Sequence, residues 1–443
     1  MIVRPTGSRG TVRFGRVASF VLALAGLAVV ATTGVAAGAR STATPPMRAA
    51  IAEQLPRALS LARMREDLRA LERIADRNGG SRAAGTPGYA ASVRYVSYQL
   101  RRAGYKPQVT AFPYLAYFET LERGRQLAPI ERELRLEALE YSPSTPKGGI
   151  RARVVESGDG CSRDDFGAVR GVIALAERGT CFFAVKAANA RAAGAVALLV
   201  FNSEAGSFDG TLGDPQATAI PVAGIARSIG QELAATPDAI VEMELATVTR
   251  QAKSRNVIVD AQPRDPRVLM VGAHLDSVPA GPGINDNGTG VAATLEVARV
   301  LRKSSRPFAV RFAFWGAEEL GLFGSSAYAG TVARKKVVGY LNLDVVGSPS
   351  RQYGVYGDDR YVARWLQYLG RSGTSAGKID IQGRSDHAPF AQRGIPVGGL
   401  YAGDYACYHR ACDRVASVDF GALRELASAA AFGVASFAPL HGR

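Results

Sequence analysis

The chain has 443 residues, of which 47% are hydrophobic and 21% are charged. These proportions are ordinary for a globular protein longer than one average domain, so we expect one large domain and a further unit. The formal net charge of +15 could suggest a nucleic-acid partner. Arg and Lys are scattered, however, and do not gather with aromatic residues on one element, so we expect no nucleic-acid partner.

The first 39 residues are typical of a cleaved export signal. Four arginines precede the apolar stretch 17–30, and small residues follow at 37–39. An uncleaved anchor is the alternative, because the apolar stretch and its Ala/Gly tail nearly reach membrane-spanning length. The small residues and the absence of charge before Arg40 favour cleavage. We therefore expect a secreted or extracytoplasmic protein without stable membrane association. Removal of residues 1–39 takes away the four arginines and lowers the formal net charge from +15 to +11.

The next segments open the main domain. Residues 40–56 have the composition of a flexible linker or propeptide. Apolar periodicity predicts helices over 64–76 and 89–103, and 105–112 has the pattern of a strand. We assign residues 57–129 to the first part of this domain.

Residues 130–250 have a different character. Runs of β-branched and apolar residues between glycines predict strands at 171–176 and 195–201, and the alanine-rich stretch 182–194 is helical in pattern. We interpret this region as a separate β-rich unit inserted into the main domain, which then resumes over 251–440.

Four cysteines in an exported chain should be paired. Cys407 lies close to Cys412, and Cys161 and Cys181 are twenty residues apart. Local pairing within each of these two sets is the economical expectation.

The chain after Arg255 alternates strands and helices, as the core of a parallel sheet should. The predicted strands are 256–260, 268–274, 308–315 and 337–344, and the predicted helices are 290–301, 320–329, 359–370 and 420–435.

Side chains that can bind metals or protons stand at or just after the ends of three of these strands. They are His274, Asp276, Asp286, Glu318, Glu319 and Asp344. Taken singly, the Glu pair could be an acidic first helical turn and Asp344 a turn or capping residue. Chance placement of so many at the edge where an open α/β sheet puts its binding crevice is improbable.

The remaining histidines divide into three cases. A disulfide across 407–412 would fix the orientation of Tyr408 and His409, which suits a metal ligand. His387 is interpreted as a structural or supporting residue, and His441 in the tail is assigned no role. Two histidines and three carboxylates suit two zinc ions that share one carboxylate and lie about 3.5 to 4 Å apart, so the expected cofactor is two Zn²⁺ per chain.

Six motifs in order, with a seventh ahead of them, resemble the secreted M28 zinc aminopeptidases of bacteria. The motifs are GAHLDS at 272–277, GINDNGTG at 283–290, GAEELGLFGS at 316–325, NLDVVG at 342–347, GRSDHAPF at 383–390 and CYHRACD at 407–413, preceded by NGGSRAAGTPGY at 78–89. The resemblance covers nearly all of the chain after the signal.

This resemblance implies a role for each candidate residue. It implies that Asp286 bridges two zinc ions, that His274 and Asp344 complete one site, and that Glu319 and His409 complete the other. Glu318 would be the general base, Tyr408 would stabilise the oxyanion, and Asp276 would support His274.

The inserted unit resembles a protease-associated (PA) domain. The similar segments are GDGCSRDDF at 158–166 and GVIALAERGTCFFAVKAANARAAGAVALLVFN at 171–202. The resemblance implies a Cys161–Cys181 disulfide and a non-catalytic domain over or beside the active-site cleft. Lys186 and Asn189 are interpreted as features of its fold.

We therefore expect an α/β fold with a three-layer α/β/α core, a mostly parallel mixed sheet and an inserted PA domain. The expected activity is removal of N-terminal residues from peptides or proteins by a monomeric, exported metallo-exopeptidase. A carboxypeptidase or dipeptidase on the same scaffold is the alternative, and Arg384 could then bind a substrate carboxylate. A binding protein without activity should have lost ligands, and none is missing.

Overall fold

The computed structural model describes residues 45–208, 210–261, 267–304 and 308–439. The expected export signal and His441 lie outside these ranges. Within them, the search for a helix long and apolar enough to cross a lipid bilayer finds none.

The first described element differs from the expected linker over 40–56. From Pro45 the chain forms helix α1 (Pro45–Arg57). Ala52 and Leu55 are buried in the main hydrophobic core, to which helix α10 (Phe420–Phe437) also contributes. Burial of these two side chains anchors a segment whose composition alone had indicated no fixed structure.

The main sheet is built around four adjacent parallel strands. Their order is β14 (Val397–Tyr401), β11 (Val337–Leu343), β9 (Val268–His274) and β10 (Val310–Trp315). Beyond β14 lie the antiparallel β12 (Tyr353–Gly357) and, at the edge, β13 (Ala376–Lys378). On the other side, β10 pairs in antiparallel orientation with the end of β8. The mostly parallel mixed sheet that we expected is confirmed.

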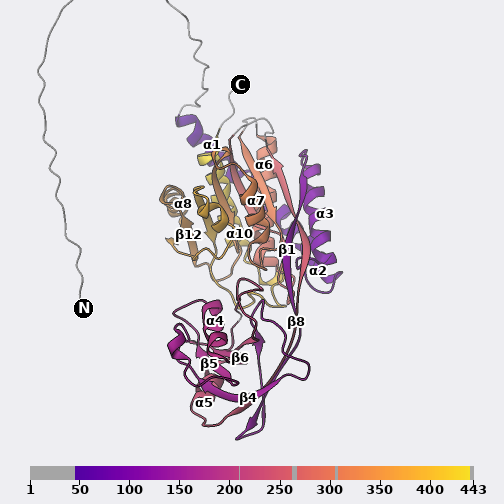
Figure 1. Cartoon of the computed structure of the whole chain (residues 1–443). Coiled ribbons are helices and arrows are strands. Elements are labelled where there is room, and N and C mark those ends of the chain that lie inside the picture. Colours follow the sequence, from indigo (N-terminus) through magenta and orange to yellow (C-terminus); the bar gives the residue numbers. More distant parts are fainter. Residues whose placement is uncertain (1–44, 209, 262–266, 305–307, 440–443) are drawn as a thin grey trace, which may run out of the picture. The chain divides into compact units, whose positions relative to one another are not determined.

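Helices cover both faces of this sheet (Figure 1). Leu269 and Val271 of β9 pack into the core of one face, whereas Met270 packs with Trp315 in the core of the other. The first face is covered by α1, α2 (Leu61–Asp76), α3 (Pro87–Arg102), α6 (Gly290–Lys303), α8 (Asp359–Arg371) and α10, and the second by α7 (Phe323–Thr331) and α9 (Ala388–Gln392). This alternation produces the three-layer core that the sequence predicts.

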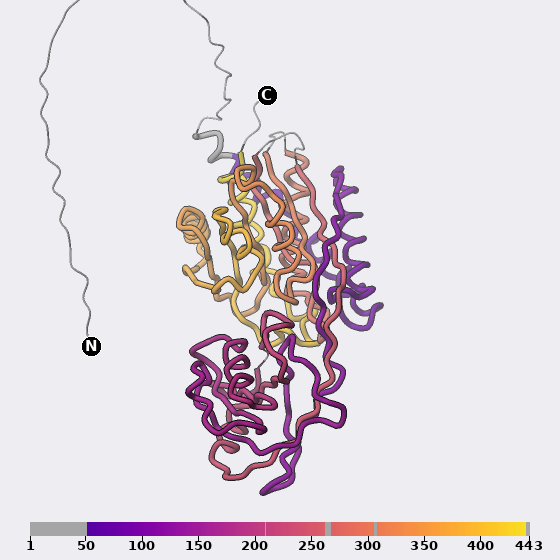
Figure 2. Tube along the Cα trace, viewed as in Figure 1, coloured from indigo at the N-terminus to yellow at the C-terminus, as the bar shows by residue number. Residues whose placement is uncertain are grey.

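Two long strands lead out of the main sheet. β1 (Gln108–Ala128) and β8 (Ile240–Asp260) each have 21 residues and pair in antiparallel orientation along most of their length. They lie side by side in Figures 1 and 2. Both are far longer than the strands expected at 105–112 and 256–260. In β8 the sequence pattern missed the outer part, because residues 248–251 are exposed and lack the apolar alternation of a half-buried strand.

The outer halves of β1 and β8, with the elements between them in sequence, form what we call the inserted unit. Its parallel strands are β4 (Ile150–Glu156), β5 (Ile173–Glu177), β6 (Ala197–Phe201) and β7 (Val222–Ile225), with short β2 (Arg132–Leu134) and β3 (Glu137–Ala138) and helices α4 (Phe183–Ala193) and α5 (Arg227–Ala234). A Cys161–Cys181 disulfide ties its loops, with 5.8 Å between the Cα atoms. The expected pairing is confirmed, as is the pairing of Cys407 with Cys412.

Strand β14 was not predicted, although it occupies the middle of the main sheet. Its sequence contains Gly398 and Gly399, which weaken any strand pattern. A Cβ atom on Gly399 would lie 2.0 Å from the Tyr356 ring, and one on Gly398 would lie 2.8 Å from the Trp365 ring. The glycines are therefore needed because aromatic side chains press against both faces of the strand.

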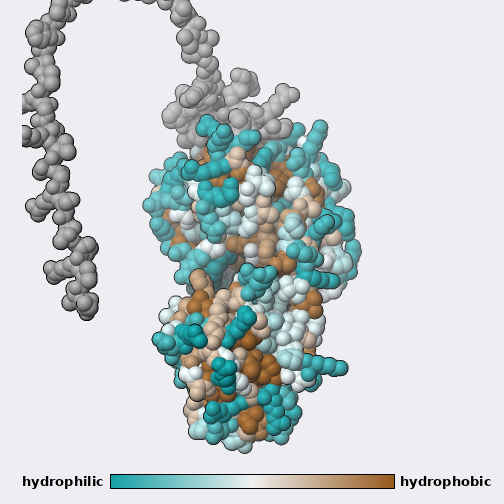
Figure 3. All heavy atoms as spheres, viewed as in Figure 1, coloured by the Kyte–Doolittle hydropathy of each residue, from teal (hydrophilic) through white to brown (hydrophobic). Residues whose placement is uncertain are grey.

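The face seen in Figure 3 is mostly hydrophilic, with smaller hydrophobic areas between.

The packing of α1 can be tested by substitution. Leu55 is 7% exposed, so Leu55→Ala should lower the free energy of unfolding by about 2 to 4 kcal/mol through lost burial and a residual cavity. Gln54→Ala, on the exposed side of the same helix, should change it by less than about 0.5 kcal/mol. Urea unfolding followed by circular dichroism measures both, and equal effects would show that α1 does not pack in solution.

Candidate metal centre

The candidate residues meet at one edge of the main sheet. His274 ends β9, Glu318 and Glu319 follow β10, and Asp344 follows β11. His409 lies in the loop after β14. Because these four strands are adjacent and parallel, their carboxyl ends bring the side chains together.

Two groups of potential ligands share one carboxylate. The His274 Nε2 atom lies 2.9 Å from Asp286 Oδ1 and 3.3 Å from Asp344 Oδ1. The His409 Nε2 atom lies 3.4 Å from Asp286 Oδ2 and 3.0 Å from Glu319 Oε2. Within each group the ligand atoms all lie within 4.8 Å of one another. Asp286 thus offers a different oxygen to each group, as a bridging ligand does.

The donor set fits divalent metal ions. Burial, and next to it the charge of Asp286, raise the pKa of Glu319 to about 7. Asp344 Oδ1 and Glu319 Oε1 are buried atoms without a hydrogen-bond partner among the described residues. Crowded, desolvated carboxylates of this kind are stabilised when they coordinate cations, and paired His and carboxylate ligands suit zinc.

Glu318 lies outside both ligand groups but close to them. Its Oε2 atom is 3.9 Å from His274 Nε2, and the residue is 8% exposed. The pKa of Glu318 lies well above its usual range, because burial and the carboxylates of Asp386 and Asp344 outweigh the lowering effect of His274. A carboxylate with raised proton affinity beside the ligands is suited to accept and return a proton.

Asp276 supports the glutamate pair through the backbone. Its two carboxylate oxygens accept hydrogen bonds from the N–H groups of Glu318, at 3.2 Å, and Glu319, at 3.3 Å. Its Oδ1 atom lies 3.9 Å from His274 Nδ1. The fully buried Asp276 therefore links the ends of β9 and β10.

Tyr408 and His409 form a stacked pair in the loop closed by Cys407 and Cys412. Their ring centroids are 3.9 Å apart and their planes are 18° from parallel. Burial, and then the charge of Asp286, raise the pKa of the Tyr408 phenol, although this side chain is 47% exposed. The hydroxyl therefore keeps its proton and can act as a hydrogen-bond donor.

Asp413 is a site residue that sequence reasoning missed. It accepts hydrogen bonds from the backbone N–H of Asn285, at 2.8 Å, and of Asp286, at 3.0 Å. The Tyr405 hydroxyl donates to it at 2.9 Å. Asp413 thus fixes the backbone of the shared ligand; its only signal was its place in the CYHRACD motif.

Arg82 was also missed. It is fully buried, and its guanidinium donates to the backbone carbonyls of Leu275, Pro282 (2.8 Å) and Gly283 (2.5 Å). Burial lowers its pKa to about 10, so the group remains a cation, and its charge is offset by nearby Asp276. This cation therefore joins the beginning and the end of the single loop that runs from His274 to Asp286.

A hydrogen-bonded chain supports Asp344 from inside the sheet. The Ser385 hydroxyl donates to Asp344 Oδ2 at 2.6 Å and accepts from the Asn342 side chain at 2.7 Å. The next residue but one, His387, lies against the Tyr356 ring at 4.9 Å and belongs to neither ligand group. Burial lowers its pKa to about 4.

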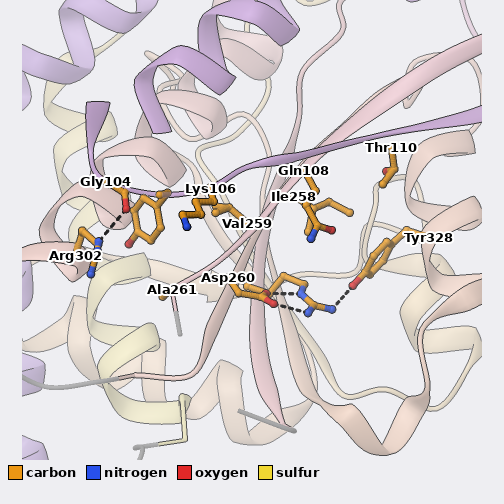
Figure 4. Close-up of a pocket in the computed structure, with 12 residues that line it drawn as sticks. Gly104, Lys106, Gln108, Thr110, Ile258, Val259, Asp260, Ala261, Arg302 and Tyr328 are labelled. Carbon is orange, nitrogen blue, oxygen red and sulfur yellow. Dashed lines mark hydrogen bonds and ion pairs between the residues drawn. The ribbon is translucent and has the colours of Figure 1, made fainter. Parts of the chain in front are cut away.

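A separate cavity of about 540 Å³ lies away from this cluster (Figure 4). It is lined by the end of β8 and the start of β10, so it lies toward the opposite end of β10 from the glutamate pair. The Asp260 carboxylate in its wall is bound by Arg311 at 2.5 and 2.7 Å. The described residues that line it include no histidine, so it offers no comparable ligand set.

Comparison with known families gives two matches. Peptidase family M28 matches residues 256–433, which contain the cluster described above. The PA domain family matches residues 150–233, which lie in the inserted unit.

Curated proteins similar to the chain are aminopeptidases. An aminopeptidase of Pseudomonas aeruginosa is 36% identical over 434 residues, which cover 85% of this chain and 81% of that protein. The probable lipoprotein aminopeptidase LpqL of Mycobacterium tuberculosis is 38% identical over 416 residues, covering 86% and 82%.

Solved structures that are similar to this chain are also aminopeptidases. An aminopeptidase from Aneurinibacillus sp. strain AM-1 has a TM-score of 0.78 at 28% identity, covering 88% of this chain and 97% of that one. BSAP, a zinc aminopeptidase from Bacillus subtilis, has a TM-score of 0.66 at 28% identity, covering 86% and 95%.

The role of Asp413 leads to a prediction about metal affinity. Asp413→Ala removes the acceptor for the Asn285 and Asp286 N–H groups, so the affinity for a divalent metal should fall by about 10- to 100-fold. Asp413→Asn, which keeps an acceptor oxygen, should lose less. Competition with a chromogenic chelator measures both, and wild-type affinity in Asp413→Ala would contradict the assigned role.

Proposed function

The chain belongs to peptidase family M28, and we propose that it is an exported aminopeptidase that works through two zinc ions bridged by Asp286. It is a metallo-exopeptidase with an inserted PA domain. One observation carries the proposal: the two oxygens of Asp286 face two different histidines, each of which is joined by a further carboxylate.

The chain supplies a complete ligand set for two ions. His274 and Asp344 would hold one zinc ion, Glu319 and His409 would hold the other, and Asp286 would hold both. When bound, zinc supplies Lewis acidity, which polarises the scissile carbonyl and lowers the pKa of the attacking water toward about 7.

The proton transfers are assigned to Glu318. This carboxylate accepts a proton from the attacking water and returns it to the amine that leaves when the peptide bond breaks. Asp276 keeps Glu318 in place through its backbone N–H. The protonated hydroxyl of Tyr408 donates a hydrogen bond to the oxygen on which negative charge develops.

Similar proteins of Pseudomonas aeruginosa and Mycobacterium tuberculosis are aminopeptidases, which supports a substrate with a free N-terminus. Arg384, which could bind a C-terminal carboxylate in the alternative enzyme, is exposed. It donates instead to the Ile381 carbonyl at 3.2 Å, within its own loop. An aminopeptidase therefore remains the preferred assignment.

The organisation of the chain completes the proposal. The peptidase domain comprises helix α1 (Pro45–Arg57), the rest of residues 57–129, and residues 251–440. The PA domain comprises 130–250, and residues 1–39 are a signal removed on export. The two disulfides fit an oxidising compartment outside the cytoplasm. We propose that the mature enzyme is a monomer whose partners are peptides or proteins.

The two adjacent glutamates should respond differently to the same substitution. Glu318→Gln removes the proton acceptor but no ligand, so turnover should fall by about 10² to 10⁴-fold while two zinc ions remain bound. Glu319→Gln should instead lower the zinc content. Steady-state kinetics and metal analysis of both variants decide the assignment; loss of zinc from Glu318→Gln alone would exchange the two roles.

Blocked peptides test the direction of attack. A peptide amidated at its C-terminus should be cleaved from its free N-terminus, whereas the same peptide acetylated at its N-terminus should be resistant. Mass spectrometry of the products distinguishes the two outcomes, and cleavage of only the N-acetylated peptide would support a carboxypeptidase.

A further inference from the structure

The turn that carries Glu318 and Glu319 has a constrained shape. Ala317 and Leu322 both adopt left-handed backbone conformations, with φ of 55° and 59°. The N–H groups of Gly321 and Leu322 donate to the Glu318 carbonyl at 2.8 and 2.9 Å. Non-glycine residues in this conformation cost free energy, so contacts outside the turn must hold its shape.

The peptidase domain holds this turn through two polar side chains. Asn256 accepts a hydrogen bond from the Gly316 N–H at 3.1 Å and donates one to the Gly324 carbonyl at 2.8 Å, so it fixes both ends. Asp276 accepts from the N–H groups in the middle. Both side chains bind backbone atoms of the turn.

The apolar side is held by Phe323. Its backbone N–H donates to the Ala317 carbonyl at 3.0 Å, so the backbone of Phe323 closes the turn. The ring packs into two hydrophobic clusters. One contains Ala317 itself and Tyr114 of β1, whose ring centroid lies 5.4 Å away.

The second cluster that Phe323 contacts is a hydrophobic core of the inserted unit. It includes the buried residues Tyr117, Leu139 and Tyr141. The other core of the inserted unit, which contains Leu233, does not include Phe323. The Phe323 side chain thus joins a core of the inserted unit to the turn that bears Glu318.

We propose that Phe323 is a positioning residue through which the inserted PA domain holds the Glu318 turn in its active shape. This inference rests on the proposed function of Glu318. The PA domain, which has no catalytic residues, would thereby contribute to turnover. When the core around Leu139 loosens, the Phe323 ring loses its support, and Glu318 then shifts relative to the metal ligands. A displacement of about 1 Å at such a position can cost about 100-fold in rate.

Two matched leucines test the proposal. Leu139 and Leu233 are 0% and 2% exposed, and both lie in the inserted unit. Leu139→Ala should lower kcat by about 10- to 100-fold with KM and zinc content close to wild type, whereas Leu233→Ala should leave kcat within about 2-fold. Phe323→Ala should reproduce the loss and Phe323→Leu should restore most of it.

Hydrogen exchange gives a readout that is independent of catalysis. The amides of Gly321, Leu322 and Phe323 should exchange faster in Phe323→Ala and Leu139→Ala, and at the wild-type rate in Leu233→Ala. Equal effects of the two leucine variants on kcat and exchange, or a folded Phe323→Ala enzyme with wild-type values, would overturn the proposal. If the wild-type protein had no peptidase activity, that result would count against the proposed function. The hydrogen-exchange pattern of the variants would still decide whether the inserted unit holds the turn.

Discussion

The rest of the site depends on one buried carboxylate shared between two histidines. One histidine, His274, ends β9, and the other, His409, lies in the loop after β14. Strand β11 lies between these two strands, so the loop that carries Asp286 must extend across its end to contact both histidines. Like charges must also be tolerated around it, since Glu319 and Asp344 face the same centre. Such an arrangement is stabilised when cations are bound, so metal binding and the local fold are coupled.

The groups that hold this carboxylate come from distant parts of the sequence. Arg82 precedes the first long strand, yet it binds backbone carbonyls at the beginning (Leu275) and the end (Pro282 and Gly283) of the loop that leads to Asp286. Asp413, near the other end of the chain, accepts the backbone N–H of Asp286. The ligand geometry therefore exists only in the complete fold. The contacts of Phe323 with a core of the inserted unit concern a different group, the turn that carries Glu318.

Some of the strands whose ends carry ligands are apolar on both faces, and the sequence pattern predicted these strands. Strand β9 was predicted with its observed bounds because its seven residues are all buried. Strand β14 was missed because aromatic neighbours require glycines there, and glycine removes the strand signal. Arg82 and Asp413 could not be predicted from local patterns, since each acts on backbone atoms far away in sequence. The chemistry of two identical neighbours does not separate Glu318 from Glu319, so only the resemblance of the GAEELGLFGS motif to a known family gave them different expected roles.

Anomalous diffraction at the zinc absorption edge, from crystals of the purified protein, would locate the metal ions. We predict two peaks on either side of Asp286, one between His274 and Asp344 and the other between Glu319 and His409. A single peak, or coordination of an ion by Glu318 in place of Glu319, would contradict this prediction.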